Sequence, residues 1–64
     1  MNFRFERDKK AVENGDYSIL KERKAELEKL ARQIKAERNG FRLQCLGQEF
    51  ITRRNEYTVL DALV

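Results

Sequence analysis

Apolar residues in the middle third of the chain recur at helical spacing. Residues 17–39 contain neither glycine nor proline and are rich in Ala, Leu, Glu, Lys and Arg, which have the highest helix propensities. Projected at 100° per residue, their larger aliphatic side chains form a single stripe. We therefore predict one long amphipathic helix over residues 17–39. The apolar stripe consists of Leu20, Leu27, Leu30, Ala31 and Ile34.

Both ends of this helix carry boundary signals. A side-chain oxygen of Asp16 or Ser18 can accept a hydrogen bond from the first-turn amides, and Gly40 suits the left-handed position after the last turn. Two arginines, Arg23 and Arg38, interrupt the stripe. We expect their methylene stems to cover the edge of the core while their guanidinium groups reach water. The alternative is that they meet acidic groups on a partner.

The period changes after Gly40 and predicts β-structure. Apolar and polar residues alternate from Phe41 to Leu46, Gly47-Gln48 suits a two-residue turn, and residues 49–53 suit a returning strand. The expected fold class is therefore α+β. In this fold the long helix packs on an antiparallel β-hairpin or three-stranded meander over residues 41–60.

The chain ends give weaker signals. Phe3 and Phe5 would share one side of a short strand, and Asn14-Gly15 is a strong turn sequence. Arg54-Asn55 is read as a further turn, and residues 56–64 suit either a strand or a short C-terminal helix, with the helix preferred. Without a linker or repeat, residues 1–64 are expected to form one small domain.

Composition excludes most catalytic chemistry. The 64 residues include no histidine, and their three glycines are too far apart for a phosphate-binding loop. The single cysteine, Cys45, has no histidine to activate it and is expected to be a small buried hydrophobe. We expect no enzyme activity, no metal site and no cofactor.

The beginning of the chain predicts a cytoplasmic location without membrane attachment. Polar and charged residues alternate with the apolar ones near Met1, so the sequence lacks the apolar core of a signal peptide, and no stretch approaches 18 apolar residues.

Charge is concentrated on the predicted helix. Residues 17–39 hold seven basic and four acidic side chains, which accounts for the whole net charge of +3. The two flanks of the apolar stripe differ in sign, so a direct pair of these helices would favour a parallel homodimer. The basic flank consists of Lys21, Lys24, Arg32 and Lys35, and the acidic flank of Glu22, Glu26 and Glu37.

Two functional hypotheses follow. The predicted helix is longer than the hairpin, so about half of it would need another surface, from the chain ends, from a second copy or from a partner. Small size without catalytic residues favours a non-catalytic protein that occupies a surface of a larger protein or nucleoprotein complex, as accessory and inhibitor proteins of phages or mobile elements do. The alternative is a small DNA- or RNA-binding regulator. Either would use the basic flank with Arg53 and Arg54, although an ordinary solvated helix face is the simpler explanation of that flank.

Overall fold

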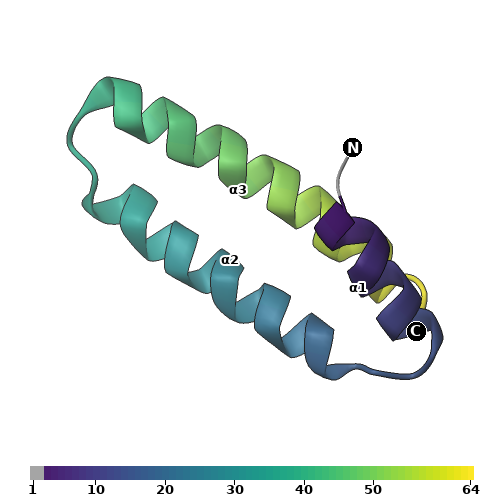
Figure 1. Ribbon diagram of the computed structural model, residues 1–64. Helices are drawn as coiled ribbons and strands as arrows, with labels where there is room; N and C mark the ends of the chain where they lie inside the picture. The colour runs from purple at the N-terminus through teal and green to yellow at the C-terminus, as the bar shows by residue number, and fades with distance from the viewer. Residues whose placement is uncertain (1–2) are drawn as a thin grey trace.

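Three helices form the structure, a computed structural model that describes residues 3–64 (Figure 1). They are α1 (Phe3–Glu13), α2 (Ser18–Ala36) and α3 (Gly40–Asp61). α2 and α3 lie side by side as an antiparallel hairpin, and α1 packs at the end where α2 begins and α3 ends. The molecule measures 41 × 23 × 15 Å and is therefore thin in one direction.

The predicted long helix is confirmed, with slightly shorter ends. The expectation that Asp16 or Ser18 caps the helix is wrong, because Tyr17 is the N-cap residue and its side chain makes no capping hydrogen bond. Asp16 instead accepts a hydrogen bond from the Ser18 backbone N–H at 3.2 Å in the turn before α2. α2 stops at Ala36 because Glu37 turns to an extended conformation, with φ −77° and ψ 131°. The expected terminating role of Gly40 is wrong, since Gly40 is the first residue of α3, and the Asn39 side chain caps α3 by accepting from the Arg42 backbone N–H at 3.1 Å.

The α+β prediction is wrong, because residues 40–61 form a helix and no strand occurs among residues 3–64. The alternation from Phe41 to Leu46 covers only six residues and does not continue. Over the full segment, the residues directed towards the other helices follow alternating intervals of four and three, typical of a helix packed along one seam. They are Leu46, Phe50, Arg53, Tyr57 and Leu60. Packing along this seam outweighs the strand propensity of the Phe, Ile, Thr, Tyr and Val residues.

The predictions for the chain ends are partly right. Asn14-Gly15 forms the expected turn, and Gly15 has φ 92°, a conformation that glycine adopts without strain. Phe3 and Phe5 lie in α1 and not in a strand. Arg54-Asn55 is no turn, and residues 56–61 continue α3 instead of forming a separate short helix. Inside α3 the hydroxyl of Thr58 donates to the Arg54 carbonyl at 2.9 Å.

The buried core of the described residues is small and mixed in character. Its apolar members are Val12, Leu30 and Leu60, one from each helix, and the charged residues Asp8 and Arg23 are buried beside them. The helix that was expected to extend beyond its covering hairpin is instead packed along α3, its main neighbour. Most of the apolar stripe of α2 therefore packs within the chain, with Ala31 exposed, and the parallel α2 homodimer stays a prediction.

Candidate partner-binding surfaces

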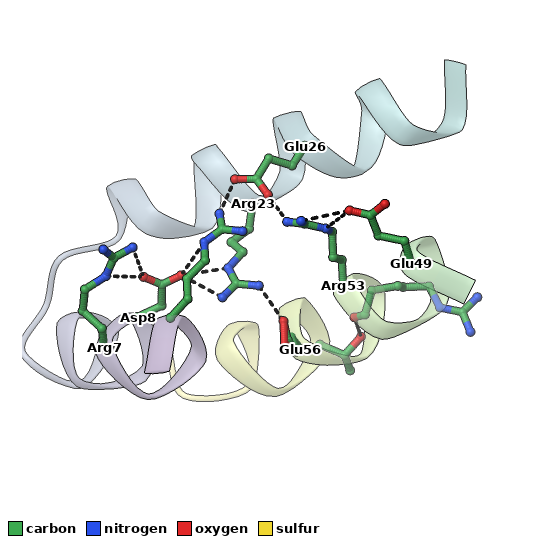
Figure 2. A network of polar contacts seen from close by, with 10 residues as sticks. Arg7, Asp8, Arg23, Glu26, Glu49, Arg53 and Glu56 are labelled. Atoms are coloured by element: carbon green, nitrogen blue, oxygen red, sulfur yellow. Dashed lines mark hydrogen bonds and ion pairs between the residues drawn. The ribbon is translucent and has the colours of Figure 1, made fainter. Parts of the chain in front are cut away.

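A buried ion cluster joins the three helices (Figure 2). Arg23 on α2 lies between Asp8 on α1 and Glu56 on α3. Its Nε donates to Asp8 Oδ2 at 2.9 Å, and its Nη1 donates to Glu56 Oε1 at 2.9 Å. Nη2 lies 2.8 Å from the same Asp8 oxygen, an ion pair without good hydrogen-bond geometry. Because the side chains of Arg23 and Asp8 are only 2 % exposed, the expectation that Arg23 reaches water is wrong. The acidic groups that it meets belong to its own chain.

A second, more accessible cluster is centred on Glu26 of α2. Arg4 donates to Glu26 Oε1, and Arg53 Nη1 donates to Glu26 Oε2 at 2.6 Å. Arg53 also donates from Nε to Glu49 Oε1, one turn earlier on α3, at 3.0 Å (Figure 2). The hydrogen bond from Arg4 is the main cause that lowers the pKa of Glu26. Partial burial opposes it, and the positive charges of Arg4, Arg53 and Arg23 add to the lowering.

The cations that pair with carboxylates between the helices are all arginines, although other arginines are exposed. In every ion pair within residues 3–64 the cation is an arginine. No lysine of this part of the chain pairs with a carboxylate, and all but Lys9 are exposed. The planar, multidentate guanidinium suits the crowded contacts between helices, whereas the ammonium group retains its hydration more readily at the surface.

Four of the predicted contact residues form one exposed surface on α2, which we call the basic face. Their spacing places them along one flank of the apolar stripe of α2, on the side away from the buried Arg23 and Leu30. All four are exposed, and no ion pair satisfies their charge within the described residues. Glu28 lies in the middle of this surface and is also exposed. The basic face consists of Lys21, Lys24, Arg32 and Lys35.

The other two predicted contact residues do not join this surface. Arg53 lies within α3, not at a turn, and its guanidinium is directed inward to Glu26 and Glu49. Arg54 is exposed, but it belongs to α3, a different helix from the one that carries the basic face. A combined contact from helix and turn, as the sequence predicted, is therefore not assembled.

A second surface was missed at the level of sequence. α3 carries, opposite its packed seam, a row of residues that are all exposed and uncharged, at intervals of four, three, four, three and four. We call it the uncharged stripe. Its apolar ends are well exposed, with Phe41 at 75 % and Val59 at 47 %. Cys45 belongs to this row and is exposed, contrary to the prediction of burial. The uncharged stripe consists of Phe41, Cys45, Gln48, Thr52, Asn55 and Val59.

The surface hollows offer little for a small ligand. One of about 380 Å³ lies beside the Glu26 cluster, where its two arginines, Arg4 and Arg53, are already held by carboxylates. No group of three potential metal ligands comes together within residues 3–64. In the same part of the chain, no helix has both the length and the apolar character needed to cross a bilayer.

Comparison with known proteins finds no relative: no family model, no curated protein and no solved structure matches the chain. Any functional conclusion therefore depends on the two exposed surfaces alone.

Proposed function

We propose that the protein is a small, non-catalytic binding protein whose basic face docks on an acidic surface of a larger protein or nucleoprotein complex. The observation that supports this most strongly is the division of the cations: the arginines between helices are neutralised internally, whereas the four cations of the basic face are left unpaired. A row of unpaired charges on a rigid helix attracts an oppositely charged surface and orients it. The cytoplasmic location expected from the sequence is kept as part of this proposal.

The position of Glu28 favours a protein partner over nucleic acid. This carboxylate lies between Lys24 and Arg32 on the basic face. A phosphate backbone is negative along its whole length, so Glu28 would repel it at the centre of the contact. A protein surface can place a basic residue opposite Glu28 and acidic residues on either side. The nucleic-acid hypothesis also expected Arg53 to contact phosphates, but its guanidinium group is paired with Glu26 and Glu49.

A charge-reversal pair tests the proposal. Lys24→Glu with Lys35→Glu reverses two charges of the basic face, and both side chains point to solvent, so we expect an unchanged fold by circular dichroism. Capture from the native cell followed by mass spectrometry should show a protein that the parent chain retains and this variant loses. The matched control is Lys10→Glu with Arg38→Glu, which changes net charge equally at exposed positions outside the basic face. Equal retention by both variants would show that the basic face is not the contact.

Binding to short duplex DNA separates the two partner classes. If the four cations contacted phosphates, affinity would fall with salt at a log–log slope of about −0.9 per contact. We expect no micromolar binding at about 50 mM salt, where phosphate contacts are strong. Tight, salt-sensitive binding that Lys24→Glu with Lys35→Glu abolishes would make the protein a nucleic-acid binder.

A further inference from the structure

The strongest unexplained feature is the uncharged stripe of α3. In a chain with 39 % charged residues, six exposed positions in a row along one helix face carry no charge. Their alternating intervals of four and three match the spacing by which two helices pack along a seam. Within residues 3–64, α3 therefore carries an inner seam that packs on the other helices and an outer, exposed row with the same spacing. Gln48 and Thr52 of this outer row line a hollow together with Arg4 of α1.

The surface area of the chain points to a missing contact. The accessible area is 5017 Å². A compact monomer of 7.6 kDa is expected to expose about 4,300 Å². The surplus of several hundred Å² is comparable to the area that each partner contributes to an interface at the small end of the size range, about 600 Å² per partner. The thin shape explains it, because a layer of single helices leaves the outer side of α3 uncovered.

We infer that the uncharged stripe is a homodimer interface, in which α3 packs antiparallel against α3 of a second copy. A second copy fits because it brings another uncharged row, so no charge of either row is buried without a partner. If the two-fold axis of the dimer passes through the centre of the stripe, Phe41 lies opposite Val59 of the second copy. The apolar ends of the two rows thus meet each other, and the polar centres, Gln48 and Thr52, also face each other.

The residues flanking the stripe select the antiparallel direction. Gln44, Ile51 and Thr58 line one side, and in the antiparallel pair Ile51 meets its own copy at the two-fold axis. In a parallel pair Ile51 would instead face the charged Glu56 of the second copy. Glu49 faces its own copy, and in each chain its charge is offset by Arg53 at 3.0 Å.

The dimer goes beyond the proposed function and uses none of its residues. α2 packs on the opposite side of α3 from the stripe, so both basic faces remain on the outside of the dimer. An interface one helix long lies below about 1,200 Å², a size typical of weak contacts. We therefore expect association that rises between micromolar and near-millimolar concentration.

Sedimentation equilibrium provides the first test. The apparent mass of the parent chain should rise from 7.6 kDa towards twice that value with concentration. Thr52→Lys, at the centre of the stripe, should raise the dissociation constant at least tenfold. Because Thr52 is exposed, this variant should keep its helicity as a monomer. The matched control Arg54→Lys, two residues away and outside the stripe, should associate like the parent. A parent chain that stays monomeric at near-millimolar concentration would overturn the inference.

Disulfide trapping tests the direction and the register. In the antiparallel pair Cys45 lies opposite Asn55 of the second copy, so Asn55→Cys, with Cys45 retained, should form a covalent dimer under mild oxidation. The parent chain should not, because two copies of Cys45 would be separated by about ten residues of helix, or roughly 15 Å. Cross-linking of the parent chain as efficiently as the Asn55→Cys variant would show a parallel pair and overturn the assignment.

Discussion

Arg23 shows how much of this fold depends on single charged residues. It occupies a position in the apolar stripe of α2, where the sequence alone suggests an arginine that reaches outward. The structure directs it inward because two acidic residues, Asp8 and Glu56, lie within hydrogen-bonding distance. Three helices thus share one guanidinium group, and each contributes only one buried aliphatic side chain to the core.

Arg23→Met should therefore be strongly destabilising. The substitution leaves Asp8, which is 2 % exposed, without its main counter-charge, and such losses cost about 3–5 kcal/mol. Urea unfolding monitored by circular dichroism measures this change. The double variant Asp8→Leu with Arg23→Met removes both buried charges and should lose less stability than Arg23→Met alone. A double variant that is equally unstable would mean that packing, not charge, explains the effect.

An exposed pair serves as the control for this measurement. Arg42 Nε lies 3.7 Å from Glu37 Oε2, and the Arg42 side chain is largely exposed. Surface pairs of this kind contribute about 0–1 kcal/mol. Arg42→Met should therefore unfold at nearly the same urea concentration as the parent chain.

The ionised Glu26 side chain should make the stability of the fold depend on pH. Its pKa is lower in the folded state, chiefly because Arg4 donates a hydrogen bond to the carboxylate. Its contribution to stability is therefore complete above the unfolded pKa of about 4.3 and is lost as pH falls through the lower, folded pKa. Glu26→Gln should have a lower free energy of unfolding than the parent chain at neutral pH. This difference should disappear in acid, where Glu26 is protonated. A difference in stability between the two proteins that does not shrink as the pH falls below the unfolded pKa would contradict this. Glu22→Gln, at an exposed carboxylate of α2 without an ion pair, is the control and should show a smaller difference at neutral pH.

At the scale of elements, α3 is where sequence and structure diverge. α2 could be predicted because its composition and its periodicity agree, even though its two expected end signals were wrong. α3 contains Gly47 and several β-branched residues, which locally favour a turn and a strand. Its helical state depends on contacts with α1 and α2, distant in sequence, so a short window could not show it. An amphipathic helix is recognised in a sequence by the contrast between its apolar and its charged face. This contrast is weak in α3, because charged residues are scarce on two opposite sides of the helix.

Gly47→Ala distinguishes the helix from the expected hairpin. Gly47 lies inside α3, its φ is not positive, and an added methyl group would meet nothing within 4 Å. Alanine should then stabilise the protein by about 0.5–1 kcal/mol. In a hairpin turn the same change would be destabilising. Gly15→Ala is the matched control and should lower the melting temperature, because φ 92° strains alanine.

The candidate surfaces were predictable to different degrees. The basic face followed from helical spacing alone, since Lys21, Lys24, Arg32 and Lys35 are exposed on one side of a correctly placed helix. Arg53 could not be placed, because its role depends on Glu26 of another helix. The uncharged stripe was visible in the sequence only after residues 40–61 had been assigned as a helix. The sequence feature that reveals this stripe is a series of uncharged residues separated alternately by four and three positions.

At the scale of the whole molecule, the hairpin of α2 and α3 separates two surfaces of different chemistry. The basic face lies on the outer side of α2 and the uncharged stripe on the outer side of α3, with the ion clusters between them. Charge reversal on the basic face should thus leave self-association intact, and Thr52→Lys should leave partner binding to a single chain intact. Each surface can be tested without disturbing the other.

The use of arginine for the ion pairs between helices also has a chemical consequence. Enzymes that acetylate proteins modify lysine ammonium groups and remove their charge, whereas guanidinium groups are left unchanged. Lys21, Lys24 and Lys35 are accessible to such modification, while Arg4, Arg23 and Arg53 continue to hold the helices together. Acetylation of these three lysines would therefore remove three of the four positive charges of the basic face and leave the arginines between the helices charged.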